Sequence, residues 1–404
     1  MATERPRRPM SREEAQARRE HIQWRKEKQA ESRELAQGPI DLPFLLLLLL
    51  LIAIGLVMLL SASFPSAYYE EDNPTYFFLR QGVFAVGGVA IMLLISRFNY
   101  QRLRGVAKLF LYFSIILLVL VLIPGVGITR NNATRWLGVG QLLTFQPSEV
   151  AKLAIIIYFS DSISRKKDKM RTFRYGVLPY CLILGVIAIL MMLEPHLSGT
   201  VLILGTGAVL MFVGGIRWYW VGGAAALAGG GAALLLTGVV KYGQSRIAMW
   251  KDPFIDPQGA GYQLGQSLIT IGTGGLLGSG LGKSRQKFLY LPEEHNDFIF
   301  AIVCEELGLI GAAIIMLLFA ALILRGYWIA LHARDRFGSL LVVGVITVIA
   351  MQVFLNIGVV TGLLPTTGIS LPFFSYGGTA LLIQLAGMGI VLSVSRQMKP
   401  TKNG

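Results

Sequence analysis

The stretch that decides the fold lies near the start of the chain. Residues 44–60 read FLLLLLLLIAIGLVMLL and contain no charged side chain. A run of this length approaches the roughly 20 apolar residues with which an α-helix crosses a bilayer. Comparable apolar blocks recur through the 404 residues. The sequence therefore predicts a membrane protein and excludes a soluble enzyme, a disordered chain and a secreted disulfide scaffold.

Composition supports the same conclusion. Hydrophobic residues make up 54% and charged residues 15% of the chain, whereas roughly 25% charged residues is usual for soluble domains. The net charge is +14, from 37 Lys and Arg against 23 Asp and Glu. Basic residues of membrane proteins gather on the cytoplasmic side, so this excess predicts topology rather than nucleic-acid binding. Cys181 and Cys304 lie in apolar segments, which favours buried thiols over a disulfide or metal site.

The apolar blocks predict an all-α integral membrane protein, a polytopic bundle of about ten transmembrane helices. The expected spans are about 42–62, 77–95, 106–124, 147–160, 176–193, 200–214, 219–240, 297–324, 338–360 and 377–395. Residues 1–40 are expected to form a disordered basic tail, 41–397 a single membrane domain and 398–404 a second tail. Most Lys and Arg then fall on the side of the N-terminus, which predicts that both termini are cytoplasmic.

One connection is much longer than the others. Residues 241–296 form an extracytoplasmic loop between the seventh and eighth spans, and loops of this length are usually functional or disordered. The middle of this loop, 264–281, is apolar but broken by glycines. An interfacial or re-entrant segment is therefore expected there rather than a further span.

The first group of candidate site residues surrounds the start of the fourth span. Arg135-Trp136 is followed by Gln146-Pro-Ser-Glu-Val-Ala-Lys152. Pro147 suits the first position of a helix, and Glu149 in the first turn is favoured by the helix dipole. Lys152 shares a face with Glu149 and lies roughly 7 Å below Pro147. Such a lysine must snorkel, pair or line a wet cavity, and a Glu149–Lys152 ion pair that closes the helix end is the structural alternative.

Further polar groups stand at other span ends. Glu194-Pro195-His196 ends the fifth span, where Pro195 stops the helix, so capping explains most of this motif. Asp297 stands at an expected helix start, where an N-cap is the simplest interpretation. Glu305 and Glu306 lie two to three turns further on, and at that depth at least one should meet a cation, a proton or water. Their role stays open between structure and site.

Several motifs are absent from the sequence. It contains no GxxxxGK[ST], no GxGxxG after a strand, no HExxH and no Cys/His metal spacing, which argues against a nucleotide cofactor. The Gly/Pro-rich loop 365–378 carries hydroxyls whose simplest role is to hydrogen-bond a bent backbone. What remains is a membrane protein with acidic and basic groups converging on one face. This pattern fits a transporter or an enzyme that acts on a lipid-linked substrate.

At these residues the chain resembles the SEDS family (shape, elongation, division and sporulation), which groups FtsW, RodA and SpoVE. The resemblance covers about 42–396 and is carried by Arg135-Trp136, Gln146–Lys152, Glu194-Pro-His-Leu-Ser-Gly199, Gly261-Tyr-Gln-Leu-Gly-Gln-Ser267, Leu291–Ala301 with Glu305–Gly308, and Gly362–Gly378. Residues 284–292 and 361–365 look more like FtsW or SpoVE than RodA.

The resemblance implies a peptidoglycan glycosyltransferase that polymerises lipid II at the outer face of a bacterial cytoplasmic membrane, most like the polymerase of the division septum. It implies as partners the growing glycan strand, a class B penicillin-binding protein with transpeptidase activity, and other divisome membrane proteins, with no nucleic acid. The alternatives are a polymerase for elongation or sporulation, a lipid II flippase, and a non-catalytic scaffold that recruits the transpeptidase.

The resemblance also implies residue roles. Asp297 corresponds to the proposed catalytic aspartate and is expected to act as general base, with a divalent cation, Mg or Mn, held there. Arg135 and Lys152 are expected to neutralise the diphosphate of the leaving group. The residues expected to bind substrate are Arg135, Trp136, Glu149, Lys152, Glu194, His196, Gln266, Ser267, Ser375 and Tyr376.

Overall fold

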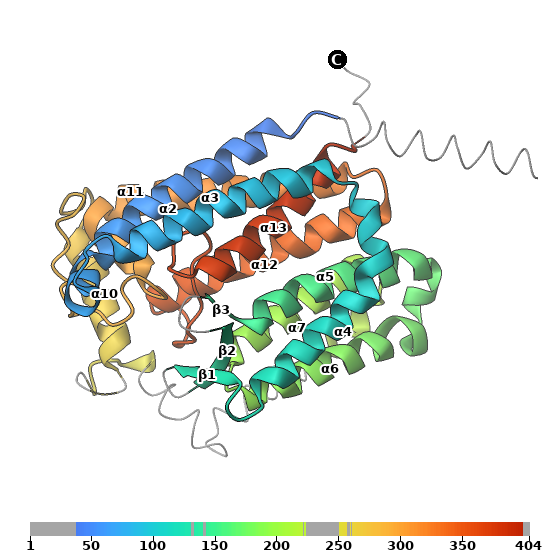
Figure 1. Cartoon of the computed structure of the whole chain (residues 1–404), viewed down its shortest axis with the longest axis horizontal. Helices are drawn as coiled ribbons and strands as arrows, with labels where there is room; N and C mark the ends of the chain where they lie inside the picture. Colours follow the sequence, from blue (N-terminus) through green and yellow to red (C-terminus); the bar gives the residue numbers. More distant parts are fainter. Residues whose placement is uncertain are drawn as a thin grey trace, which may run out of the picture.

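Long antiparallel helices dominate the computed structural model, which describes residues 38–130, 133–139, 143–220, 222–223, 250–256, 259 and 261–398 (Figure 1). The α-helices are α2 (Leu42–Glu71), α3 (Tyr76–Arg97), α4 (Leu103–Val121), α5 (Pro147–Lys166), α6 (Leu178–Leu193), α7 (Leu197–Val213), α10 (Tyr262–Gly274), α11 (Ile299–Leu331), α12 (Arg336–Val360) and α13 (Gly378–Ser395). Short helical turns of other types cover Tyr100–Arg102, Lys167–Arg171 and Phe173–Val177.

The predicted bundle of membrane helices is confirmed. Seven helices of the described ranges are long and apolar enough to cross a membrane, and α7 is apolar but shorter. Each expected span that lies within the described residues coincides with a helix. The expected span 219–240 lies almost wholly outside those residues, as do the expected tails 1–40 and 398–404. The total of about ten spans therefore stays a prediction.

The two ends of the described chain meet at one end of the bundle (Figure 1). The backbone N–H of Asp41, which precedes α2, donates to the hydroxyl of Ser395 at the end of α13. Arg325 of α11 forms two hydrogen bonds with the Asp41 carboxylate, at 3.0 and 2.7 Å. We call this end of the bundle the termini end. The opposite end carries the sheet and the loops described below, and we call it the cavity end.

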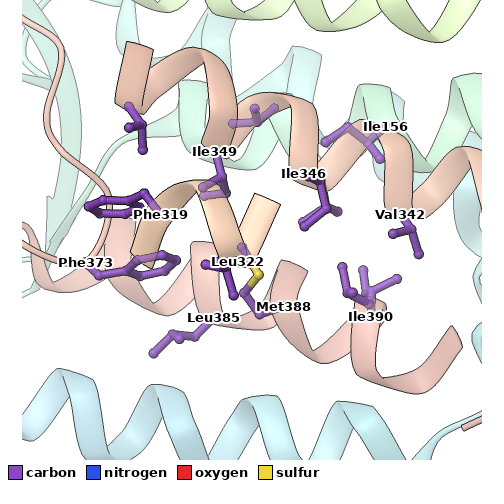
Figure 2. Close-up of a cluster of buried hydrophobic side chains, with 14 of the residues drawn as sticks. Ile156, Phe319, Leu322, Val342, Ile346, Ile349, Phe373, Leu385, Met388 and Ile390 are labelled. Atoms are coloured by element: carbon purple, nitrogen blue, oxygen red, sulfur yellow. The ribbon is translucent and has the colours of Figure 1, made fainter. Parts of the chain in front are cut away.

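The core lies around α12. Of the apolar spans, α12 is the most buried and α3 is among the least, which places α12 inside the bundle and α3 at its surface. Figure 2 shows Ile346 and Ile349 of α12 in one cluster with Phe319 and Leu322 of α11. Phe373, from the loop before α13, stacks on Phe319 with ring centroids 6.4 Å apart. The loop that contributes to the candidate site is therefore anchored in the core.

α11 is broken at Gly308, which has φ 66° and ψ −172°. Segment 275–280, directly after α10, lies against the break and satisfies its backbone groups. Ser279 and Gly280 donate their N–H groups to the carbonyls of Glu305 and Glu306, at 2.9 and 3.0 Å. Irregular backbone is tolerated at membrane depth only where protein or water supplies such partners. With 13 residues, α10 is roughly 20 Å long by helical rise, too short to span a bilayer.

A small antiparallel sheet covers the cavity end of α4 and α5. Its strands are β1 (Gly127–Arg130), β2 (Ala133–Val139) and β3 (Leu143–Phe145), in the order β1-β2-β3. Leu137 of β2, opposite Phe145 of β3, packs on Leu117 and Val121 of α4. No periodic pattern in the sequence indicates these strands, because they are only three to seven residues long.

Candidate functional site

A cavity of about 480 Å³ opens at the cavity end. Five parts of the chain form it: the facing ends of α2 and α3, the sheet with the start of α5, the α6–α7 corner, the segment before α11, and the loop that leads into α13. Its charged lining residues are Glu70, Glu71, Arg80, Arg135, Glu149, Lys152, Glu293 and Asp297. Of the residues predicted to form the site, Asp297, Arg135, Trp136, Glu149, Lys152, His196, Ser375 and Tyr376 line the cavity.

Asp297 is not the N-cap of α11. The helix begins at Ile299 with Phe298 as N-cap, and no side chain caps it. The Asp297 carboxyl is partly buried, and an ideal Cβ placed on Gly368 would stand 3.3 Å from its Oδ2. Burial raises the pKa of Asp297 to about 6, and the nearby Glu293 carboxylate adds to this effect while Arg135 opposes it. A carboxylate with such a pKa is a stronger base than an ordinary aspartate and is still ionised at neutral pH.

Arg135 joins the sheet to the α6–α7 corner. Its Nε donates to the carbonyl of Glu194 at 3.3 Å, and its Nη2 donates to the carbonyl of Pro195. These bonds hold the guanidinium at the wall of the cavity. The Glu194 carboxyl is buried behind this wall and does not line the cavity. Burial raises the pKa of Glu194 to about 8, although the Arg135 charge opposes this shift.

His196 does line the cavity, and its Nδ1 lies 3.2 Å from the amide nitrogen of Gln146. Burial lowers the pKa of His196 to about 3, and the charges of Arg135 and Lys152 lower it further. The imidazole is therefore neutral over the whole working range of pH. It can orient a substrate by hydrogen bonding, but it cannot contribute positive charge.

Glu149 and Lys152 form the ion pair that their spacing allows. The Lys152 Nζ lies 2.6 Å from Glu149 Oε1, and both side chains are buried. The structural alternative is thus confirmed, and both residues also line the cavity. Glu149 neutralises much of the charge of Lys152 in this arrangement, so the pair presents a dipole rather than an isolated cation to a ligand.

Glu305 and Glu306 belong to a separate buried network. Glu306 accepts from Lys287 Nζ at 3.0 Å and from Ser61 Oγ of α2 at 2.7 Å. Glu305 accepts from the backbone N–H of Arg285 at 3.0 Å and from the Ser284 hydroxyl. Neither carboxylate lines the cavity. Their hydrogen bonds fasten segment 284–287 to α11 and α2, which favours the structural role.

Two other predicted residues lie away from the cavity. Ser267 is fully buried, and its hydroxyl donates to the carbonyl of Val360 at 2.8 Å. Gln266, its neighbour in α10, does not line the cavity either. The expectation that they bind substrate there does not fit this placement, because α10 packs against α11 and its glycine-rich continuation fills the break at Gly308 instead.

The cavity also contains residues that the sequence analysis did not assign to the site. Glu293, in the left-handed region with φ 57°, stands beside Asp297 and accepts from the Asn296 amide at 2.6 Å. Gln352 of α12 is almost fully buried and lines the cavity. A signal existed in the sequence, since Gln352 and Asn356 are amides four residues apart in an apolar span and so share one helix face.

No cluster of three metal-ligating side chains occurs among the described residues. Glu293 and Asp297 nevertheless form a pair of carboxylates at the cavity wall. Magnesium is usually bound by one or two carboxylates, with waters and substrate phosphates completing its coordination. Two carboxylates are a donor set of this kind, and they are too few for a metal site built from protein side chains alone.

Comparisons with known proteins agree with this architecture. Residues 41–400 match the cell cycle protein family FtsW/RodA/SpoVE. Stage V sporulation protein E of Bacillus subtilis is 45% identical over 362 residues, covering 88% of this chain and 97% of that protein. The probable peptidoglycan glycosyltransferase FtsW of Geobacter metallireducens is 41% identical over 362 residues, covering 89% and 96%.

Solved structures are similar as well. RodA, the rod shape determining protein of Thermus thermophilus, superposes with a TM-score of 0.67 at 29% identity, covering 90% of this chain and 99% of that one. A chain of a peptidoglycan synthase complex that coordinates polymerization and crosslinking superposes with a TM-score of 0.73 at 29% identity, covering 89% and 98%.

The fold and the cavity together define a multi-pass membrane protein with a charged pocket at one end of its helix bundle. The chain belongs to the FtsW/RodA/SpoVE family, so the expected family is confirmed.

Proposed function

We propose that the chain is a peptidoglycan glycosyltransferase that polymerises lipid II at the outer face of the cytoplasmic membrane, as FtsW-type enzymes of the division septum do. The observation that carries the proposal is the Asp297 carboxyl, which lines the same cavity as Arg135 and Lys152 and is not used as a helix cap. Relatives named as probable peptidoglycan glycosyltransferases, about 40% identical over nearly their whole length, support this class of enzyme.

The chemistry follows from the groups in the cavity. A sugar hydroxyl of one substrate attacks the anomeric carbon of the other, and the bond from that carbon to undecaprenyl diphosphate breaks. Asp297 accepts the proton of the attacking hydroxyl. Arg135, fixed by two carbonyls, and the Lys152–Glu149 pair face the negative charge that develops on the leaving diphosphate. Because diphosphate is a good leaving group, a second carboxylic acid is less necessary than in an inverting hydrolase.

A divalent cation, Mg or Mn, fits this scheme. Asp297 and Glu293 would hold it, and when bound it would supply further positive charge to the diphosphate oxygens. In that arrangement Glu293 also offsets part of the charge that the cation brings to Asp297.

An apolar groove on the outside of the bundle suits a lipid-linked substrate. It has a volume of about 440 Å³ and is lined by Leu56 of α2 and by Phe78, Leu79, Gly82, Val83 and Val86 of α3. Phe77, the neighbour of Phe78, lines the charged cavity instead. The groove and the cavity thus lie on two faces of the same helix, which would let a polyprenyl tail stay in the bilayer while its head group reaches Asp297.

We infer that the termini end is cytoplasmic and the cavity end is outside. The connections 97–108, 165–174 and 325–336, which carry four, six and three Lys and Arg, join helices at the termini end. The long connection 241–296, which carries six, is the exception. Basic connections stay on the cytoplasmic side of a membrane. A class B penicillin-binding protein is the proposed partner, since one similar structure is a chain of a peptidoglycan synthase complex. Lipid II, the glycan strand and other divisome proteins complete the proposed set of partners.

The alternative functions are less well supported. A flippase needs polar groups along a path through the bilayer midplane, whereas the charged lining residues gather at the cavity end. A scaffold without catalysis would leave Asp297 as a helix cap, and the structure gives it no such role. The FtsW relatives favour division over elongation, although the similarity to stage V sporulation protein E keeps a sporulation polymerase as the second candidate.

The proposal is tested by reconstituting the reaction. The purified chain, together with its transpeptidase partner, receives fluorescent lipid II and a divalent metal, and the products are resolved as glycan ladders. We expect ladders from the native protein and none from Asp297→Ala or Asp297→Asn. Unchanged ladders from folded variants would remove Asp297 as the base. Lipid II flipping in liposomes without any polymerisation would favour the transporter instead.

A further inference from the structure

Three consecutive carbonyl oxygens hold the segment that carries Asp297. The carbonyl of His295 accepts from the backbone N–H of Tyr376 at 2.9 Å. The carbonyl of Asn296 accepts from the Ser375 hydroxyl at 2.7 Å. The carbonyl of Asp297 accepts from the Asn356 amide nitrogen at 2.7 Å. All three donors belong to α12 or to the loop before α13. Each carbonyl of residues 295–297 is therefore hydrogen-bonded to a part of the bundle that is distant in sequence.

Asn356 has a second acceptor that makes its position unusual. The same amide nitrogen donates to the carbonyl of Ile369 at 2.6 Å. Ile369 follows Gly368, whose backbone stands against the Asp297 carboxyl. The Asn356 amide therefore links the backbone of Asp297 to segment 368–369, which lies on the other side of the Asp297 carboxyl. Asn356 is 1% exposed, so water cannot replace it without a rearrangement of the helices around it.

These hydrogen bonds go to the backbone of residues 295–297 and not to the Asp297 carboxylate. Within the described part of the chain, no hydrogen bond reaches the Asp297 carboxylate oxygens, whereas its carbonyl is tied to α12. Segment 295–297 precedes the first turn of α11, so the helix does not fix its backbone. Its position must come from elsewhere, and Asn356 supplies the bond nearest to the carboxyl.

We propose that Asn356 is the positioning residue for Asp297: its amide joins the Asp297 and Ile369 carbonyls and so fixes the carboxyl against the acceptor hydroxyl. The inference rests on the proposed glycosyltransferase function and adds a residue on α12 to it. Without this amide, two buried carbonyls lose their donor and must find other partners, which costs free energy. The segment then shifts, and a misplacement of about 1 Å at a catalytic group can cost about a hundredfold in rate.

The test uses an isosteric change and a matched control. Asn356→Leu keeps the volume and removes the donor, whereas Asn356→Gln keeps a terminal amide. Thr347→Val serves as the control, because Thr347 of the same helix is also buried and bonds Tyr327 of α11 at 3.0 Å, far from the cavity. Each variant is reconstituted with the transpeptidase partner, and kcat and KM for lipid II are measured separately.

We expect Asn356→Leu to lower kcat by about ten- to a hundredfold while KM changes by less than about twofold, because the cavity still binds the substrate. Asn356→Gln should recover part of kcat, and Thr347→Val should keep it even if its melting temperature falls by a similar amount. Hydrogen exchange should quicken in segment 294–298 of Asn356→Leu and not in that of Thr347→Val. This readout does not depend on turnover.

Two results would overturn the inference while leaving the proposed function intact. One is a kcat for Asn356→Leu equal to the native value in an enzyme that Asp297→Ala inactivates. The other is a loss in Asn356→Leu that Thr347→Val reproduces at equal melting temperature, which would make Asn356 a purely structural residue. A native protein that makes no glycan in the presence of lipid II and metal would instead overturn the function, and the inference with it.

Discussion

Two pairs of carboxylates stand a few residues apart around the start of α11, and the chain treats them in opposite ways. Glu305 and Glu306 have their oxygens occupied by Lys287, two hydroxyls and backbone N–H groups. Glu293 and Asp297 line the cavity, and at Asp297 the bonds go to the backbone carbonyl rather than to the carboxylate. Carboxylates therefore act as structural hydrogen-bond acceptors at Glu305 and Glu306 and line the candidate reactive site at Glu293 and Asp297.

The difference lies in what is hydrogen-bonded. A buried carboxylate with a full set of donors is held in place as part of the fold, because removing the cation that pairs with it leaves an uncompensated charge. A carboxylate whose backbone is fixed but whose oxygens are not used keeps a raised pKa and the capacity to take a proton. Burial by itself does not distinguish the two pairs, so the donors must be followed atom by atom.

The largest effect is expected from Asp297→Asn. The amide has the same shape but cannot accept a proton from the sugar hydroxyl, so the rate of polymerisation should fall by about 10²- to 10⁴-fold. The melting temperature should change little, since no hydrogen bond to the carboxylate supports the fold. Initial rates from glycan ladders and thermal unfolding in detergent measure the two quantities. If Asp297→Asn lowered the melting temperature together with the rate, the Asp297 carboxylate would also support the fold, and the contrast with Glu305 and Glu306 would fail.

Lys287→Met should act on stability instead. It leaves Glu306 buried without its cation, which typically costs about 3–5 kcal/mol, and the melting temperature in detergent should fall accordingly. The rate per folded molecule should persist, because the network lies outside the cavity. The double variant Lys287→Met/Glu306→Gln supplies the control, since it removes both charges and should regain most of the stability. A double variant as unstable as the single one would argue against the pairing.

The pH dependence of polymerisation should report Asp297. Because the base acts in its ionised form and burial raises its pKa to about 6, kcat/KM should be level above that pH. Below it, the rate should fall about tenfold per pH unit as the carboxyl is protonated. Initial rates between about pH 4.5 and 8 measure this profile. A midpoint near 4, the value of an ordinary aspartate, would show that the carboxyl is not desolvated in the working enzyme.

The smallest effect is expected from Glu305→Gln, which makes at Glu305 the same carboxylate-to-amide change as Asp297→Asn. Ser284 and Arg285 donate to different oxygens of Glu305, so the amide keeps one acceptor and turns its NH2 group toward the other donor, and the loss should be about 1–3 kcal/mol. Thermal unfolding measures this loss, and glycan ladders should remain close to those of the native protein. A rate loss as large as that of Asp297→Asn would show that Glu305 takes part in the reaction, and the distinction between a structural and a reactive pair would then fail.

Local signals made much of the fold predictable. Runs such as 44–60 determine their own helices, because a long apolar segment in a bilayer must satisfy its backbone internally. The Glu149–Lys152 pair was predictable for a similar reason, since residues three apart on a helix meet wherever the helix lies. The motif around Asp297 pointed to the site by resemblance, whereas its simplest local interpretation, an N-cap, was wrong.

The residue pattern therefore predicts the membrane bundle, the family and half of the charged residues that line the cavity, Arg135, Glu149, Lys152 and Asp297. The packing of the helices places Gln266 and Ser267 outside the cavity, sets segment 275–280 into the break at Gly308, and brings Asn356 to the Asp297 carbonyl. These contacts join residues dozens of positions apart, and no spacing along the chain encodes them. Hydrogen-bond donors distant in sequence bind the Glu305 and Glu306 carboxylates and, at Asp297, the backbone carbonyl instead, so the division between structural and reactive groups appears only once the helices are packed.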